Sequence, residues 1–415
     1  MRVLIWTQYF WPENFFINTI TRSLSELGVE VTVLTGKPNY PEGQILSGYT
    51  AAGIHREKCF EIDIIRIPIK ARGSGSSIGL ALNYLSFILS GYLFAPFALH
   101  GKTFDIVFVY APSPLLQALP AIFTAWLRRI PLVLWVQDIW PDALHSTGFI
   151  KNRWVLSLIG LTVRYIYRFS DSILIQSEGF RASVEHLVND KKKIRFYPNS
   201  AEDVLVNPIT TRQYTCLDQD IKKSFSVIFA GNIGTAQSCE TIIEAATLLQ
   251  GTHNIKFYLI GNGSMADSIN KSIVDNKLNN IVMTGRVAPE NMSSIYASAS
   301  VLLLSLRDDP ALAATIPSKL QSYLAAGKPV IVSSNGESAN VVLKANAGLT
   351  SPAGNSEALA QVVLKLYEMH PEERMKLGEN GRKYFLNRYY LPDRVAELLA
   401  HFEDVVVCHS QMGKK

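Results

Sequence analysis

One stretch of the chain decides the fold of its second half: Ile316-Pro317-Ser318-Lys319-Leu320-Gln321-Ser322-Tyr323-Leu324-Ala325-Ala326-Gly327-Lys328-Pro329-Val330. The Pro-Ser-Lys turn opens a short apolar helix, Gly327 ends it, and an apolar strand follows directly. A loop that enters a helix presents unpaired backbone N–H groups and partial positive charge, which favour a bound phosphate. Lys319 would add a full positive charge at the same point. An ordinary loop–helix–strand unit with a surface lysine fits this local pattern equally well, so the surrounding sequence has to distinguish the two interpretations.

The strands around this stretch are followed by corners that contain glycine. Short apolar runs at 225–229, 255–260, 281–284 and 301–305 alternate with helical periodicity, as in a parallel sheet covered by helices. The corners are Gly231-Asn232-Ile233-Gly234, Gly261-Asn262-Gly263 and Gly285-Arg286. Since an open α/β sheet binds its ligand at the carboxyl ends of its strands, the second half is predicted to hold a ligand there.

The first half repeats the alternation of strands and helices. Apolar runs at 3–6, 29–35, 62–67, 106–110, 132–136 and 173–176 predict a second parallel, doubly wound sheet. The break at Tyr197-Pro198-Asn199-Ser200 and the polar stretch 201–222 separate the halves. We therefore predict an α/β protein with two Rossmann-like domains, residues 1–200 and 201–385, which face each other across a cleft. Residues 386–415 are predicted to form a C-terminal helix that crosses back to the first domain.

Composition narrows the class of protein. The chain has 415 residues, enough for two domains, and a net charge of +5. Residues 1–200 hold 20 Lys and Arg against 14 Asp and Glu. This excess of positive charge favours an anionic partner but is too small to indicate a nucleic-acid-binding protein. The four cysteines lie far apart and indicate neither a disulfide framework nor a zinc site. A cytoplasmic location is the expectation that follows.

Residues 78–99 carry no charge and are long enough to span a bilayer. Polar residues and Pro96 interrupt them, and aromatic residues are frequent. We expect a helix or helical hairpin that packs partly on the core and dips partly into the headgroup region on the inner face of the membrane. Basic residues that could hold such a protein against anionic lipid are Arg128, Arg129, Lys151, Arg153, Arg164, Arg168 and Lys191 to Lys193; on the alternative interpretation they are solvated helix faces.

These motifs together resemble the retaining glycosyltransferases of family four, which have the GT-B fold. The segments that carry the resemblance are Gln8 to Glu13, Leu34 to Gly43, Val136 to Asp142, Tyr197 to Asn199, Ala230 to Gly234, Asp308 to Pro310 and Ile316 to Pro329. Within that family, the chain is similar to the branch that adds N-acetyl-fucosamine-type sugars in O-antigen and capsule assembly.

The resemblance implies a division of the substrates between the domains. A UDP-sugar donor would bind in the C-terminal domain, a polyprenyl-diphosphate-linked saccharide acceptor in the N-terminal domain, and neither a metal nor a cofactor would be needed. A metal-free site must neutralise the departing diphosphate with Lys, Arg, hydroxyl and helix-terminal N–H groups. Asp138 and Lys319 are the catalytic candidates and Asn39 and Tyr40 the acceptor-binding ones. The donor-binding candidates are Asn14, Phe15, Gly231, Asn232, Gly261, Gly263, Arg286, Thr315, Pro317, Ser318, Lys319 (with the N–H groups of residues 318–320) and Ser322.

The sequence departs from the family pattern at two carboxylates. The two glutamates that usually contact the donor sugar and the ribose correspond to Ala314 and Ser322. Apolar groups at Phe15 and Ala314 would suit a 6-deoxy sugar, whose methyl group needs no hydrogen bond. A UDP-sugar 2-epimerase of the same architecture and a non-catalytic relative that binds nucleotide sugar are the alternatives. Residues 78–99 and the carboxylate losses argue against the epimerase, which would need several acid–base residues in its cleft and no membrane-seeking segment. The missing glutamates leave the non-catalytic relative open as an alternative to transfer of an N-acetylated deoxyhexose.

Overall fold

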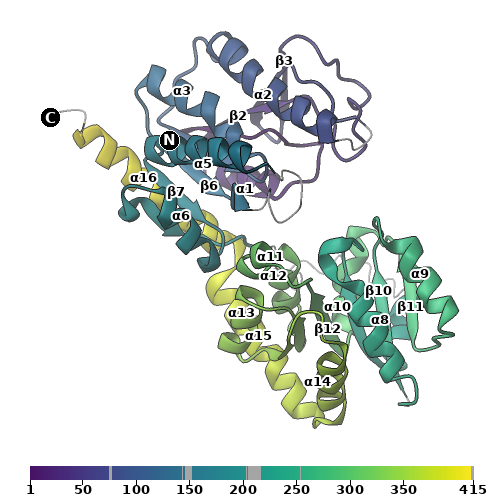
Figure 1. The fold of residues 1–415 in the computed structure, drawn as a ribbon. Coiled ribbons are helices and arrows are strands. Elements are labelled where there is room, and N and C mark those ends of the chain that lie inside the picture. Colours follow the sequence, from purple (N-terminus) through teal and green to yellow (C-terminus); the bar gives the residue numbers. More distant parts are fainter. Residues whose placement is uncertain are drawn as a thin grey trace. The chain divides into compact units, whose positions relative to one another are not determined.

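The computed structural model describes residues 1–73, 77–142, 144, 152–201, 203, 216–252 and 254–412. It divides the chain into two compact units, Met1–Tyr197 with Pro392–Lys415, and Pro198–Leu391. Lys151 of the predicted basic patch and residues 204–215 of the predicted linker lie outside the described residues. Figure 1 shows that each unit contains one sheet with helices on both of its faces.

The first unit is built on an eight-stranded sheet in the order β3-β4-β2-β1-β5-β6-β7-β8. All neighbouring strands in it are parallel except β3, which runs antiparallel to β4. The predicted apolar runs all form strands, whereas the edge strands β3 and β8 were not predicted. The strands are β1 (Arg2–Trp6), β2 (Glu30–Gly36), β3 (His55–Cys59), β4 (Ile62–Ile67), β5 (Ile106–Ala111), β6 (Leu132–Val136), β7 (Ser172–Ile175) and β8 (Ile194–Phe196).

Three helices of the first unit lie side by side: α2 contacts α3, and α3 contacts α5. The predicted helix or hairpin at 78–99 is the single helix α2. The C-terminal helix α16 belongs to this unit, and its Phe402 ring lies 5.0 Å from that of Phe108. The helices are α1 (Phe16–Glu26), α2 (Ser77–Ala98), α3 (Ala118–Arg128), α5 (Arg153–Phe169), α6 (Arg181–Leu187) and α16 (Leu391–Met412).

The second unit has a six-stranded, parallel sheet in the order β11-β10-β9-β12-β13-β14. The predicted strands are present, with β14 as the one addition. They are β9 (Phe225–Ala230), β10 (Ile255–Ile260), β11 (Ile281–Gly285), β12 (Val301–Ser305), β13 (Val330–Ser333) and β14 (Gly348–Ser351). The helices are α7 (Cys216–Lys222), α8 (Cys239–Leu248), α9 (Ala266–Asp275), α10 (Met292–Ser298), α11 (Pro310–Ala314), α12 (Ser318–Ala325), α13 (Glu337–Ala345), α14 (Ser356–Glu368) and α15 (Pro371–Arg388).

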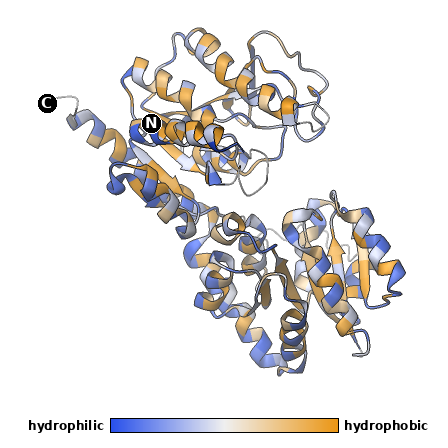
Figure 2. Ribbon diagram, viewed as in Figure 1, coloured by the Kyte–Doolittle hydropathy of each residue, from blue (hydrophilic) through white to orange (hydrophobic). Residues whose placement is uncertain are grey.

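The central strands are buried on both faces, which explains why they are continuously apolar rather than alternating. Val3 to Trp6 of β1 and Val301 to Leu304 of β12 are fully buried, and Figure 2 shows the strands as mostly hydrophobic. In each sheet the strand order reverses beside the first strand of the unit: between β1 and β5, and between β9 and β12. Such switch points open a crevice at the carboxyl ends of the strands, and the candidate residues follow those ends.

Candidate functional site

In the second unit, the loops after β9 and β10 interlock through glycine. The N–H group of Gly231 donates to the carbonyl of Ile260 at 2.8 Å, and that of Gly261 to the carbonyl of Gly285 at 2.9 Å. A Cβ at Gly261 would lie 1.8 Å from the carbonyl oxygen of Gly231, which no side chain can do. Both residues also have positive φ angles, 137° and 146°, which favour glycine. These two predicted donor-site residues therefore bring the two corners into contact.

Gly263 completes this arrangement. A Cβ there would lie 2.4 Å from the carbonyl oxygen of Ile233, in the corner after β9. The backbone of that corner is fixed by a bond from the N–H group of Ile233 to the carbonyl of Asn262, at 3.0 Å. Asn232, between these groups, is exposed. The corners thus form a compact backbone surface at the carboxyl edge of the sheet.

Lys319 lies against the same surface. Its Nζ is 4.1 Å from the centroid of the Phe229 ring and would be 2.8 Å from a Cβ at Gly231. Nζ is shielded from solvent and has no hydrogen-bond partner among the described residues. Burial lowers the pKa of Lys319 to about 8. A buried ammonium group without a partner is unfavourable, so an anion bound at Gly231 would stabilise it.

The N-terminus of α12 adds backbone donors. Pro317 precedes it and offers no side-chain cap, and the first turn contains no acidic residue. The N–H group of Leu320 donates to the carbonyl of Pro317 at 2.9 Å. The prediction that the N–H groups of residues 318–320 would all be available is therefore wrong for Leu320, because the first turn closes on itself. The N–H groups of Ser318 and Lys319 have no such bond within the described part of the chain.

Tyr323 was not predicted and fixes the geometry of this site. Its hydroxyl oxygen accepts from the N–H group of Ala230 at 2.9 Å, and the hydroxyl group donates to the Ala230 carbonyl at 3.3 Å. Tyr323 is fully buried and stands one helical turn after Lys319. It ties α12 to the end of β9, so that Lys319 is held beside Gly231. The i, i+4 spacing of Lys319 and Tyr323 was the available sequence signal.

The other predicted donor residues are dispersed. The Thr315 hydroxyl donates to the carbonyl of Ala311 at 2.8 Å, which leaves its oxygen as an acceptor, and its assignment as a donor ligand stays a prediction. Ser322 is partly exposed on α12, one turn after Ser318. Arg286 is exposed after β11 and forms no ion pair with any described residue.

In the first unit, an aromatic cluster follows β1 and β2. The rings of Phe15 and Tyr9 stack at 5.0 Å, and the ring of Tyr40 lies 5.2 Å from that of Phe15. The guanidinium group of Arg72 covers Tyr40 at 5.1 Å and Tyr9 at 5.9 Å. Asn14 is exposed beside Phe15. Tyr40 is therefore placed as a candidate ligand-contacting residue, together with Arg72, which the sequence gave no reason to select.

Asn39 does not fit its predicted role. It is fully buried, its amide donates to the carbonyl of Lys37 at 2.9 Å, and its side-chain oxygen accepts from the backbone of Arg72 at 3.2 Å. The prediction of Asn39 as an acceptor ligand is therefore corrected: its side chain shapes the loop from inside, because both of its polar atoms are used by the protein.

Glu13 supports the same loop. One carboxylate oxygen accepts from the N–H groups of Asn39 at 2.8 Å and Tyr40 at 2.7 Å, and the other from that of Phe10 at 3.2 Å. Burial raises the pKa of Glu13 to about 7, although these three donors act in the opposite direction. Glu13 thereby positions Tyr40.

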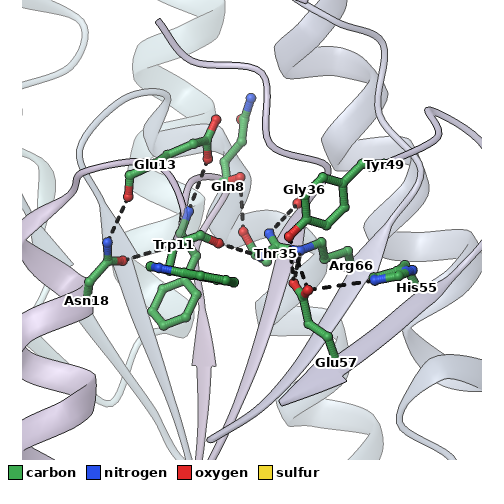
Figure 3. A network of polar contacts seen from close by, with 11 residues as sticks. Gln8, Trp11, Glu13, Asn18, Thr35, Gly36, Tyr49, His55, Glu57 and Arg66 are labelled. Carbon is green, nitrogen blue, oxygen red and sulfur yellow. Dashed lines mark hydrogen bonds and ion pairs between the residues drawn. The ribbon is translucent and has the colours of Figure 1, made fainter. Parts of the chain in front are cut away.

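A second buried network lies below this loop, as Figure 3 shows. Arg66 is fully buried and donates to Glu57, to the carbonyl of Gly36 at 3.3 Å and to the carbonyl of Trp11. It thus ties the end of β2 to the loop after β1, from which Glu13 extends.

Asp138 follows β6 at the same edge of the sheet. Burial raises its pKa to about 6, and the N–H group of Ile139 opposes that shift. Tyr84 of α2, which hydrogen-bonds with Ser113 after β5, is subject to the charges of both Asp138 and Arg72. The edge therefore combines a carboxyl group, a phenol and a guanidinium group near the aromatic cluster.

The comparisons with known proteins agree with this layout. Residues 15–200 match the family model described as "Glycosyl transferase 4-like domain", and residues 218–384 match the model "Glycosyl transferases group 1". The chain is a glycosyltransferase of the GT-B type. The second match includes all candidate residues of its unit, and the first includes those of its unit except Asn14. Among the described residues of this glycosyltransferase, no group of three or more His, Cys, Asp and Glu side chains could hold a metal ion.

Several curated glycosyltransferases are similar in sequence. The probable glycosyltransferase WbjE of Pseudomonas aeruginosa is 24% identical, with 75% of this chain and 76% of the relative covered. The putative colanic acid biosynthesis glycosyl transferase WcaI of Escherichia coli K12 is 24% identical, with 80% and 83% covered.

Solved structures share the fold. Sucrose-phosphate synthase from Thermosynechococcus elongatus superposes with a TM-score of 0.76 at 13% identity, covering 98% of this chain and 99% of that one. Anabaena HepE in complex with UDP and glucose gives a TM-score of 0.68 at 13% identity, covering 97% and 100%. Both are less similar in sequence than WbjE and WcaI, and they show the fold alone.

Proposed function

We propose that this glycosyltransferase moves an N-acetylated deoxyhexose, similar to N-acetyl-fucosamine, from a UDP-sugar to a lipid-linked saccharide during synthesis of a cell-surface polysaccharide. The transfer retains the anomeric configuration and needs neither a divalent metal nor a cofactor. The observation that carries the proposal is the buried ammonium group of Lys319, which lacks a hydrogen-bond partner and lies beside the backbone corner at Gly231.

That ammonium group suits the negative charge that a diphosphate leaving group acquires. Lys319 supplies a full charge, and the N–H groups of Ser318 and Lys319 supply hydrogen bonds at the positive end of α12. These groups are preorganised, because Tyr323 and the glycine corners fix them without a ligand. HepE, which shares this fold, has been solved with UDP and with UDP-glucose, and this supports a nucleotide sugar as the donor.

The anomeric configuration of the sugar is retained if the acceptor hydroxyl approaches the anomeric carbon on the side of the leaving group. The acceptor oxygen then forms a bond to the anomeric carbon while the bond from that carbon to the UDP oxygen breaks. The hydroxyl proton passes to the departing phosphate, so that charge and atoms balance. Asp138, with its pKa near 6, orients the acceptor or the sugar rather than acting as the nucleophile in this proposal.

Two observations bear on the sugars. Ala314 stands where the family usually has a carboxylate, and Phe15 is an aromatic surface, so both accept a methyl group without loss of hydrogen bonds. The name of WcaI, a putative colanic acid biosynthesis glycosyl transferase, supports a polysaccharide product. In the first unit, Tyr40 and Arg72 offer a ring face and a cation to the acceptor.

Because the proposed acceptor is linked to a lipid, the transfer reaction would take place at the cytoplasmic face of the membrane. Helix α2 is long and apolar enough to cross a bilayer, but one side of it packs on the protein, where a Cβ at Gly91 would lie 2.7 Å from Pro120. Its other side exposes Leu85, Leu89 and Leu93, which are 50%, 52% and 63% exposed. An interfacial position fits this division better than a span does, and Figure 2 shows how strongly hydrophobic the helix is.

Incubation of the purified protein with a panel of UDP-sugars, with and without a lipid-diphosphate saccharide, tests the proposal. We expect UDP release that requires both partners, an unchanged anomeric configuration in the product by NMR, and full activity in EDTA. Conversion of the UDP-sugar into a different UDP-sugar in the absence of the acceptor would instead identify an epimerase. Binding without turnover would identify a non-catalytic relative.

A further inference from the structure

A groove lies between α5 and α6 of the first unit, away from the loops that hold Phe15 and Tyr40. Its volume is about 900 Å³, and it starts at Pro141 and Asp142, shortly after Asp138. The side of α5 that lines it carries Arg153, Gly160 and Arg164, which recur at helical spacing on one face. The groove therefore leads away from the edge of the sheet at which Asp138 lies.

The groove is positively charged. Neither Arg153 nor Arg164 forms an ion pair with any described residue, and α5 contains no acidic residue. Among the lining residues that the structure describes, Asp142 is the one carboxylate, and it accepts a hydrogen bond from Ser183 at 3.3 Å. From α6, His186 also faces the groove. Arginine binds phosphate groups through two parallel hydrogen bonds, so this lining suits a diphosphate.

The groove is also continuous with an apolar surface. Leu161 lines it and is 59% exposed, and Trp154 and Leu158 of the same helix are 87% and 65% exposed. Helix α3 contacts both α5 and α2, and α2 carries the exposed leucines Leu85, Leu89 and Leu93. The three helices α2, α3 and α5 contain no Asp or Glu. An anionic headgroup in the groove would thus have an apolar path for its chain toward the surface that we propose meets the bilayer.

We propose that this groove binds the diphosphate and the first part of the isoprenoid chain of the lipid-linked acceptor; this inference rests on the proposed function. Arg153 and Arg164 neutralise the diphosphate, and Gly160 keeps the middle of the groove open. A Cβ at Gly160 would contact only Pro141, at 3.9 Å, so a larger side chain would extend into the groove. The saccharide then reaches the edge of the sheet where Asp138 and Tyr84 lie.

Vesicle binding tests the groove without catalysis. Phosphatidylcholine vesicles carrying geranylgeranyl diphosphate are compared with vesicles carrying phosphatidylglycerol at equal total negative charge. We expect the full-length protein to bind the diphosphate vesicles at least about tenfold more tightly. Arg153→Ala with Arg164→Ala should abolish that preference, and Gly160→Leu should do so without removing any charge.

Arg168→Ala is the matched control, because Arg168 is exposed on the same helix and does not line the groove. It should weaken binding to both vesicles slightly and keep the preference. If the double variant retains the preference, or if Arg168→Ala removes it equally, the groove assignment is wrong. UDP release by the wild type with a lipid acceptor reports on the proposed function separately: its absence together with an intact vesicle preference refutes the transfer reaction and leaves the groove supported.

Discussion

Lys319 is the residue on which the donor site depends most. It is unusual because its ammonium group is buried and lacks a hydrogen-bond partner, so the ligand-free protein bears an energetic cost at this position. A bound diphosphate removes that cost because it gives the ammonium group a partner of opposite charge. The attraction between the two charges strengthens binding. The same residue therefore lowers stability in the absence of ligand and raises affinity in its presence.

Replacing Lys319 by methionine should separate these two effects. We expect kcat/KM to fall about 100- to 1,000-fold, as for the loss of one preorganised electrostatic contact. The melting temperature of the ligand-free variant should be unchanged or higher, since an unpaired buried charge is removed. Steady-state UDP release and thermal unfolding measure the two quantities. Lys344→Met, on an exposed position of α13, is the control; equal losses of activity in both variants would contradict the assignment.

The pKa of Lys319 predicts how stability depends on pH. The folded protein releases this proton near pH 8 and the unfolded chain near 10.5, so the unfolded chain binds more protons between these values. The free energy of unfolding should therefore rise with pH across this window, by about 3 kcal/mol from this group alone. Denaturant unfolding at a series of pH values should show this slope in the wild type and not in Lys319→Met. Since a bound diphosphate favours the charged form, UDP binding should take up protons above pH 8.

The pKa of Glu13 predicts the opposite dependence of the free energy of unfolding on pH. Its pKa is raised from 4.5 to about 7, so the folded protein binds more protons between these values. The contribution of Glu13 to the free energy of unfolding should fall by about 3 kcal/mol as pH rises through this window. The difference in unfolding free energy between wild type and Glu13→Gln should change accordingly across this pH window. Parallel curves for wild type and Glu13→Gln would contradict the burial argument.

At the scale of elements, the donor site is a contact between strand ends rather than a single motif. The corners after β9 and β10 approach so closely that only glycine fits at their contact. Helix α12 is attached to them through Tyr323, whose hydroxyl group bonds both polar backbone atoms of Ala230. A change in any one of these elements would displace the others.

Gly261→Ala tests this contact. The added methyl group would lie 1.8 Å from the carbonyl oxygen of Gly231, so the two corners must separate. We expect a loss of about 2–4 kcal/mol in unfolding free energy and weaker UDP binding, measured by chemical denaturation and calorimetry. Gly251→Ala is the control, because a Cβ there meets no atom within 4 Å. An unaltered UDP affinity in Gly261→Ala would show that the corners do not shape the site.

At the scale of the whole molecule, the two units differ in surface chemistry. The first unit has an apolar, basic face on α2, α3 and α5. Residues 1–200 hold 20 Lys and Arg against 14 Asp and Glu, whereas residues 201–415 hold 20 against 21. This division fits a protein whose first unit meets a membrane and whose second unit binds a soluble donor.

Charged residues on α2 should release the protein from membranes. We expect Leu89→Glu with Leu93→Glu to reduce the fraction bound to anionic vesicles at least about tenfold, since two exposed leucines lose their burial in lipid. Flotation measures that fraction. The melting temperature should stay the same, as both side chains are exposed. Leu248→Glu, at an exposed leucine of the second unit, should leave membrane binding unchanged. If it reduces membrane binding as much as the α2 variant does, membrane binding does not depend specifically on the exposed leucines of α2.

The sequence by itself determined the two α/β halves, most strand positions and the position of Lys319 at a helix N-terminus. It could do so because buried parallel strands are continuously apolar and the Pro-Ser-Lys turn is local in the chain. The edge strands β3, β8 and β14 were not predicted. Strand β3 (His55–Cys59) is made mostly of polar residues, β8 has only 3 residues, and β14 contains a single large apolar residue, Leu349.

Only the tertiary structure decided which side chains share a site. In the folded chain Asn39 is buried, and Arg72 lies over the rings of Tyr9 and Tyr40. The tertiary structure also left the ammonium group of Lys319 without a hydrogen-bond partner beside Gly231. These properties depend on contacts between segments far apart in the chain, and burial, hydrogen-bond satisfaction and pKa are set by those contacts rather than by local sequence.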